Sequence, residues 1–222
     1  MKVIKPGFEI LRPFTWDDGA GREAIYRMIE TAGRTCYKSE KKTTAESAAR
    51  FVQKIVENHH EAMLEHASMT VKFIVDRGVS HEIVRHRLFS FAQESTRYCS
   101  YSGERFGEEI TVIEPFFYPA DTYAGKVWYE SCLHAEKAYM LLIRNGSSPQ
   151  EARSVLPNSL KTELVVTGNM REWRHFFKLR ASGETGKPHP QMAEVAVPLL
   201  MKVQNYMPEL FGDIKIPGGN GE

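Results

Sequence analysis

Cysteine is scarce in this sequence, and the few that occur lie far apart. The 222 residues include three, Cys36, Cys99 and Cys132, which are too few and too scattered for a disulfide framework or a zinc ribbon. We therefore expect reduced thiols and a cytoplasmic protein. Long apolar runs are missing as well: there is no stretch of about 18 residues to span a membrane, and residues 1–7 lack the apolar core of a signal peptide. We expect no membrane partner.

An excess of charge of one sign is also missing. The 29 basic residues face 28 acidic residues, which leaves a net charge of +1, whereas a dedicated nucleic-acid-binding protein is usually clearly basic. Positive charge is instead concentrated within residues 85–98 and 171–180, a distribution that suits a small anionic ligand better than a polymer. The glycine-rich fingerprints of a Rossmann unit and of a P-loop are both absent, so neither device holds a nucleotide here.

Hydrophobic periodicity predicts a mixture of strands and helices. Strand-like patterns occur at residues 8–13, 69–75, 110–113 and 164–167. Helical spacing occurs at residues 21–31, 44–58, 121–144, 169–180 and 191–205, with further helices beginning at Ser80 and Ser148. No repeat or linker divides the chain. The sequence therefore predicts one α+β domain over residues 1–222, with a mainly antiparallel sheet flanked by helices, one of them long.

Two capping-box patterns and one stop signal mark helix ends. Thr43-x-x-Glu46 precedes the helix at residues 44–58, and Ser148-x-x-Glu151 begins another helix with proline in its first turn. Gly146 follows the long helix as a C-terminal stop.

Residues 85–98 hold three arginines, a histidine, two serines and a glutamine around Phe89 and Phe91. The planar, forked arginine side chain pairs two-pronged with a phosphate or with the edge of a pyrimidine. Ser95 and Arg97 are spaced to close the other side of such an anion. The apolar neighbours predict a partly buried segment, in which arginines need anionic partners. A solvated basic helix is the common alternative for such a cluster.

Residues 59–66 read His-His-Glu-Ala-Met-Leu-Glu-His and suggest a metal site. A zinc peptidase needs His-Glu-x-x-His, so that two imidazoles meet the ion from one helical face. Leu64 stands where the second of these histidines would be. A looser site from His59, Glu65 and His66 is an alternative, and a helix end with solvated histidines is a more common one.

Residues 169–180 place Asn169, Trp173, Phe176 and Arg180 on one helical stripe, because eleven residues at about 100° each return close to the starting direction. An amide, two aromatic rings and an arginine in line could border a ligand cleft. The alternative is a core helix with buried aromatic residues. That alternative explains Phe176 and Leu179 but not the position of Arg180.

Four blocks of the sequence resemble the flavin-dependent thymidylate synthases. The most specific is Arg85-His86-Arg87, followed by seven residues and Ser95, which resembles the signature of that family. The others are His-Glu-x-x-Leu-Glu-His at residues 60–66, Arg-x-Val-Leu-Pro at 153–157 and Asn-x-Arg-x-x-x-x-Phe-x-x-Leu-Arg at 169–180.

This resemblance implies the synthesis of dTMP from dUMP, with 5,10-methylenetetrahydrofolate as carbon donor and NADPH as reductant acting through FAD. It also implies a homotetramer whose active sites combine residues of several subunits, with the Arg-His-Arg segment clamping FAD between subunits. We expect no metal and no nucleic acid among the ligands.

The resemblance also implies the site residues. Those expected to bind the cofactor are His60, Ala62, Arg85, His86, Arg87, Leu88, Gln93, Asn169 and His175. Those expected to bind the substrate are Glu82, Arg85, Gln93, Glu94, Ser95, Thr96, Arg97, Arg153 and Arg180. Arg180 is also expected to be catalytic, beside N3 and a carbonyl of the uracil ring. The family often has Ser or Thr at the position of Ala62 and Gln at that of Glu82, and some members carry Asn at that of His175.

Two other classes of protein remain as alternatives. A metal-dependent hydrolase would use residues 59–66, and bound metal without flavin would favour it. A non-catalytic nucleic-acid-binding domain would use the two basic aromatic segments. Tight, salt-dependent binding to DNA or RNA without flavin would favour that one.

Overall fold

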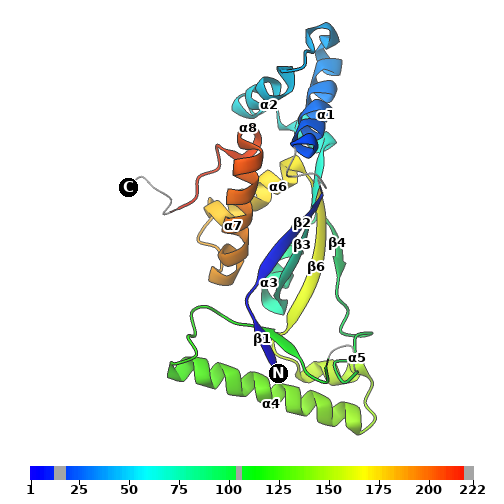
Figure 1. Ribbon diagram of the computed structural model, residues 1–222, viewed down its shortest axis with the longest axis vertical. Helices are drawn as coiled ribbons and strands as arrows, with labels where there is room; N and C mark the ends of the chain where they lie inside the picture. Colours follow the sequence, from blue (N-terminus) through cyan, green and yellow to red (C-terminus); the bar gives the residue numbers. More distant parts are fainter. Residues whose placement is uncertain (13–18, 104–106, 218–222) are drawn as a thin grey trace. The chain divides into compact units, whose positions relative to one another are not determined.

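The structure is a computed structural model that describes residues 1–12, 19–103 and 107–217 (Figure 1). It contains helices and a mainly antiparallel sheet, so the predicted α+β class with one long helix is confirmed. Contacts divide the chain into two compact units. Unit 1 comprises Met1–Gly7, Phe73–Arg85 and Ala92–Val165, and unit 2 comprises Phe8–Lys72, His86–Phe91 and the chain from Val166 onward. The single domain over residues 1–222 stays a prediction.

Four strands form one sheet in the order β2–β3–β6–β4. Their bounds are Gly7–Arg12 (β2), Ser68–Asp76 (β3), Lys161–Asn169 (β6) and Ser90–Gln93 (β4). Buried and partly exposed residues alternate along β3 and β6, which is the pattern of strands with one covered face.

The predicted strands at residues 8–13 and 69–75 correspond to β2 and β3, although residue 13 lies outside the described residues. The strand predicted at residues 164–167 is too short. Lys161 and Glu163 belong to β6 as well, and their polarity hid them because they occupy its less buried face.

A second sheet pairs β1 (Lys2–Ile4) in parallel with β5 (Thr111–Ile113), with Val3 opposite Val112. This confirms the short strand expected near residues 110–113. Within the described ranges, none of the helices combines the length and the apolar character that crossing a membrane requires.

Unit 1 contains the long helix α4 (Tyr123–Arg144), as predicted. The hydroxyl of Thr122 caps it by accepting from the Gly125 N–H at 3.0 Å. Gly146 follows the helix at a φ of 91°, a conformation that glycine adopts without strain. The buried residues packed together in this unit are Tyr101, Ile110, Val112, Cys132, Tyr139, Ala152 and Leu160.

Two shorter helices of unit 1 test the predicted caps. In front of α5 (Pro149–Ala152), the backbone N–H and the hydroxyl of Ser148 both donate to Glu151, so this capping box is confirmed. Ser80 does not start a helix as predicted. It lies inside α3 (Arg77–Ile83), whose cap is Asp76, the acceptor of the Val79 N–H at 2.7 Å. Asp76 is the last residue of β3 and directly precedes α3, so its carboxylate caps the helix and Ser80 lies within it.

Unit 2 holds most of the helices: α1 (Ala20–Tyr37), α2 (Ser47–Glu57), α6 (Met170–Phe177), α7 (Pro190–Tyr206) and α8 (Pro208–Phe211), with the 3-10 turns η1 (Glu40–Lys42) and η2 (Glu61–His66). The helix α1 continues well beyond the predicted residue 31. The capping box predicted at Thr43 does not form, because α2 begins at Ser47 and Glu46 makes no side-chain cap bond.

The helix predicted over residues 169–180 has two parts. Asn169 caps α6 by accepting from the Glu172 N–H at 2.9 Å, and after Phe177 the helix widens into a π turn, η5 (Lys178–Ser182). Such π turns are frequent at functional sites. The widening rotates Arg180 away from the direction that a regular helix would give it.

Candidate functional site

His86, the centre of the Arg-His-Arg signature, is buried in unit 2 and held from several sides. Its ring lies 5.9 Å from the ring of Phe89 and 5.0 Å from that of Phe176. Phe89 in turn packs on Gly168, where an added Cβ would lie 2.0 Å from the phenyl ring. Glycine near the end of β6 therefore lets Phe89 of the signature pack directly on this strand.

Arg180 contacts His86 directly. Its Nε donates to Nε2 of His86 at 3.1 Å, and Nδ1 of the same ring lies 3.4 Å from Oε1 of Glu172. An imidazole that accepts at Nε2 and is neutral carries its proton on Nδ1, which is the nitrogen facing Glu172. The signature and the second family block therefore meet in one polar cluster, defined here as His86, Glu172 and Arg180.

The electrostatics of this cluster favour a neutral histidine. Burial, together with the positive charges of Arg180 and His175, lowers the pKa of His86 to about 4. Burial also raises the pKa of Glu172. A neutral imidazole can accept from Arg180 without repelling its charge, so the arginine keeps its full charge beside the ring.

Sequence reasoning missed Glu172. It is buried, although acidic side chains are almost never fully buried unless paired. Its position three residues after the helix cap Asn169 is typical of the first turn of a helix, and only the fold brings it next to His86.

The arginines of the signature are not buried, contrary to the expectation for residues 85–98. Arg85, Arg87 and Arg97 are exposed, whereas His86 and Phe89 are buried. Leu88 is 75% exposed between them. The segment is therefore partly buried: His86 and Phe89 point into the protein, while the three arginines remain exposed.

The second family block does contain a buried arginine, Arg174, which is 2% exposed. It makes two bonds to Asp213, at 2.7 and 2.6 Å, and one to the Leu210 carbonyl. These bonds join α6 to α8 and to the chain after it. Arg171 pairs with Glu65 at 2.6 Å, so much of the positive charge at residues 171–180 is neutralised within unit 2.

The predicted stripe does not border an open cleft. Trp173 and Phe176 are fully buried, and the indole N–H of Trp173 donates to the Met69 carbonyl at 3.0 Å. The core-helix alternative is therefore correct for the aromatic residues. Asn169 lies at the start of this helix and Arg180 beyond its end, while His175 is exposed, with its ring 5.8 Å from that of His86.

Unit 1 brings other predicted substrate residues together. Nη1 of Arg153 donates to the hydroxyl of Thr96 at 3.3 Å, and both residues line a hollow of about 370 Å³. Arg77 and His81 of α3 line it as well. Two guanidinium groups, an imidazole and a hydroxyl around one hollow are the groups expected of a phosphate-binding site.

Three neighbouring residues of the signature make internal contacts in unit 1. The amide of Gln93 donates to the hydroxyls of Ser80 and Thr162, at 3.0 and 3.3 Å. The carboxylate of Glu94 accepts from Lys161 at 3.0 Å. The Ser95 hydroxyl accepts from the Arg97 N–H at 3.3 Å. Glu82, within α3, is partly exposed, and Arg85, just after that helix, is exposed.

His60 and Ala62 are exposed and line a different hollow, of about 400 Å³, in unit 2. Cys36 and Arg171 are among its other residues. In the described part of the chain no group of three or more His, Cys, Asp and Glu side chains is arranged to hold a metal ion.

Comparison with known proteins places this geometry in a family. The family described as thymidylate synthase complementing protein matches residues 23–209. Flavin-dependent thymidylate synthases of Corynebacterium aurimucosum and Corynebacterium glutamicum are 35% and 36% identical to the chain, over 96% and 90% of it and over 90% and 82% of their own lengths. The chain belongs to the flavin-dependent thymidylate synthase family. The predicted class of enzyme and its flavin cofactor are confirmed at the level of this family.

Two further comparisons agree with this membership. The flavin-dependent thymidylate synthase of Mycolicibacterium vanbaalenii is 33% identical over 96% of the chain and 88% of its own length. Among solved structures, the UMP/dUMP methylase PolB of Streptomyces cacaoi, bound with 5-Br dUMP, aligns with a TM-score of 0.77 at 20% identity over 96% of both chains, which shows a shared fold.

The residues of this member of the family fit a flavin. The hollow at His60 and Ala62 offers an exposed imidazole against which a flat ring can lie, while Arg171 on its lining is already paired with Glu65. Since Ala62 has no side-chain donor, its neighbourhood can contact a ligand only through backbone groups and carbon.

Proposed function

We propose that this protein methylates dUMP to dTMP, taking the carbon from 5,10-methylenetetrahydrofolate and the electrons from NADPH through FAD. The observation that carries the proposal is the hydrogen bond from Arg180 to His86. It joins the two most informative family blocks in a chain that belongs to this family. When bound, the flavin would supply the redox chemistry that turns the transferred carbon into a methyl group.

Arg180 acts on the pyrimidine in this proposal. Bond formation at C5 of uracil needs electron density at that carbon, and a guanidinium beside N3 and a ring carbonyl stabilises the anionic form of the ring. His86 holds Nε of Arg180, which fixes the direction of the planar fork. Because His86 is neutral, it does not repel Arg180, and the full positive charge of the guanidinium can act on the uracil ring.

The hollow of unit 1 is the proposed site for a phosphate group, because Arg153 and residues of α3 line it. Thr96 positions Arg153 by accepting its Nη1–H. Ser95 is a substrate ligand and not the attacking group, because a serine nucleophile needs a base within hydrogen-bond reach and its hydroxyl receives the Arg97 N–H. No protein nucleophile is required.

A homotetramer with shared active sites completes the proposal, and the exposed surfaces support it. Leu88 is 75% exposed beside two exposed arginines, and Tyr123 at the start of α4 is 84% exposed. Phe116, Phe117 and Tyr118, whose rings contact one another, are also exposed, and contiguous exposed apolar side chains favour association. The cytoplasm is the expected compartment for this chemistry.

The flavin spectrum of the purified protein tests the proposal first. We expect a yellow protein, or one that takes up added FAD, with a flavin that NADPH reduces and that dUMP with methylenetetrahydrofolate reoxidises under anaerobic conditions. A protein that binds no FAD, or whose reduced flavin ignores both substrates, would refute the proposal.

A further inference from the structure

A second hollow of unit 2 lies beside the one at His60 and has a different character. It measures about 730 Å³. The end of α1, the turn η1, residues 44–47 and α2 contribute its walls. Its lining residues are Arg34, Tyr37, Ser39, Lys42, Thr44, Ser47, Arg50, Phe51, Lys54, Ile55, Asn58 and His60. We call it the cationic groove.

The charge of the groove is one-sided. Lys42, Arg50 and Lys54 are all exposed, and the lining, all of it within the described residues, includes no aspartate or glutamate. The nearest opposing partner is Glu46, 3.8 Å from Arg50 in a pair that is more than four-fifths exposed on both sides. Such an exposed pair contributes little, so three exposed cations line the groove without a strong opposing charge.

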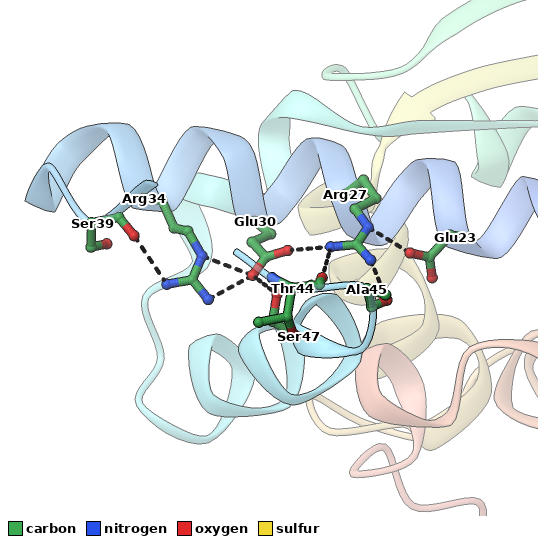
Figure 2. Close-up of polar contacts among 8 residues, drawn as sticks. All are labelled: Glu23, Arg27, Glu30, Arg34, Ser39, Thr44, Ala45 and Ser47. Carbon is green, nitrogen blue, oxygen red and sulfur yellow. Dashed lines mark hydrogen bonds and ion pairs between the residues drawn. The ribbon is translucent and has the colours of Figure 1, made fainter. Parts of the chain in front are cut away.

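The remaining cation, Arg34, belongs to the wall. Its Nε and Nη2 contact Glu30 at 2.8 and 2.6 Å, and Glu30 is only 1% exposed. Glu30 also accepts from the Ser47 hydroxyl at 2.6 Å and pairs with Arg27 at 3.1 Å. Figure 2 shows this network linking α1 to the segment before α2.

The network fixes the groove before any ligand binds. Arg27 donates to the carbonyls of Thr44 and Ala45, which fastens the connecting segment to α1. Helix α2 lies close to α1 because residue 33 is glycine, where an added Cβ would approach the Phe51 ring to 2.4 Å. The walls are therefore preorganised, while the three cations on the rim are long and adaptable.

The groove continues into the hollow that holds His60 and Ala62. Tyr37, Ile55 and His60 line both. A ligand with a flat ring against His60 and a chain carrying several negative charges would place the chain among Lys42, Arg50 and Lys54.

We propose that the cationic groove binds the glutamyl tail of the folate co-substrate, with its carboxylates opposite Lys42, Arg50 and Lys54. This inference rests on the proposed function, which makes a folate the carbon donor. Arg50 and Lys54 are four residues apart on α2 and so are neighbours on its surface, and Lys42 faces them from η1. Three separate cations on η1 and α2 suit a ligand whose carboxylates are spaced along a chain. A phosphate group calls for donors that converge on one point.

Binding of folate with one glutamate and folate with five γ-linked glutamates to the flavin-loaded protein tests this assignment. Exposed charge pairs contribute modestly, so we expect the five-glutamate form to bind roughly three- to tenfold more tightly. In the double variant Arg50→Gln and Lys54→Gln, this difference should largely disappear, because the one-glutamate form has only two carboxylates and should lose less affinity than the five-glutamate form. The matched control is Arg22→Gln with Lys202→Gln, which removes two exposed cations of unit 2 outside the groove and should keep the difference.

Two results would overturn the assignment. One is equal affinity for the two folates in the parent protein, or a preference that survives in the groove variant. The other is a groove variant that weakens NADPH binding and leaves the preference for the longer folate intact, which would assign the groove to the phosphates of the reductant. Failure of the proposed function is distinguishable from both, since it would appear as bound folate without dTMP formation.

Discussion

Arg180 donates a hydrogen bond from Nε to Nε2 of His86 across 94 residues of sequence. The bond uses Nε, the guanidinium nitrogen nearest the main chain, and so fixes the orientation of the planar guanidinium group. It is possible only while Nε2 carries no proton, and the low pKa of His86 keeps it so. A histidine in the signature thus sets the geometry of an arginine in the second block.

Arg180→Lys should separate the two halves of the reaction. Lysine keeps the charge but loses the planar fork, so flavin reduction by NADPH should stay nearly intact. Reoxidation by dUMP and methylenetetrahydrofolate should slow by at least tenfold, since a charge-assisted hydrogen bond contributes roughly 1.5–3 kcal/mol. Stopped-flow absorbance of the flavin measures both steps. Arg144→Lys, at the end of α4, is the control. A normal reoxidation step in the Arg180→Lys enzyme would remove Arg180 from the chemistry.

The stability of the protein should depend on pH through His86. Its pKa is lowered from 6.5 to about 4 in the folded chain, so between these values the unfolded chain binds a proton that the folded chain does not. The free energy of unfolding therefore falls as the pH drops from about 6.5 to about 4, by up to about 3 kcal/mol from this group. Urea unfolding at a series of pH values measures it.

His86→Gln should lose that part of the pH dependence, because the amide keeps a polar group of similar reach but does not titrate. His134→Gln, on the exposed side of α4, should keep it. Glu172, whose raised pKa acts in the opposite sense, is present in both variants. Parallel pH profiles for His86→Gln and the parent protein would show that His86 is not buried as a neutral ring.

Arg153→Ala tests the phosphate hollow of unit 1. Losing a charge-assisted contact to the phosphate should weaken dUMP binding on the order of ten- to a hundredfold. Affinity for deoxyuridine, which has no phosphate, should not change. Isothermal titration with both ligands makes the comparison, and an equal loss for the two would show that Arg153 acts on something other than the phosphate.

Ser95→Ala should raise the KM for dUMP and leave measurable turnover. The hydroxyl accepts a backbone N–H from Arg97, so its removal loosens a turn and a ligand contact together without removing a nucleophile. Steady-state kinetics separate the two parameters. Abolished turnover with unchanged dUMP affinity would instead indicate a chemical role for Ser95.

The parts of this fold that the sequence predicts are those with a local cause. The alternation of β3, the long helix α4 and the box at Ser148 all follow from residues close in sequence. The box at Thr43 fails for a tertiary reason. Arg27 holds the carbonyls of the segment before α2, and the Ser47 hydroxyl bonds to Glu30 of α1.

The same distinction between local and tertiary causes applies to the site. The motifs indicated His86 and Arg180, but their direct bond depends on the π turn after Phe177 and on the close approach at Gly168. Burial of Glu172 beside His86 has no local signal either, because it arises only when the signature packs on α6.

Transfer of a labelled carbon tests the central claim most directly. The flavin-loaded protein is incubated with dUMP, NADPH and methylenetetrahydrofolate carrying ¹³C in its methylene group, and the nucleotide is analysed by mass spectrometry and NMR. The account predicts dTMP with the label in its C5 methyl group, formed only when flavin and reductant are both present. Unchanged dUMP in the presence of a reducible bound flavin would contradict it.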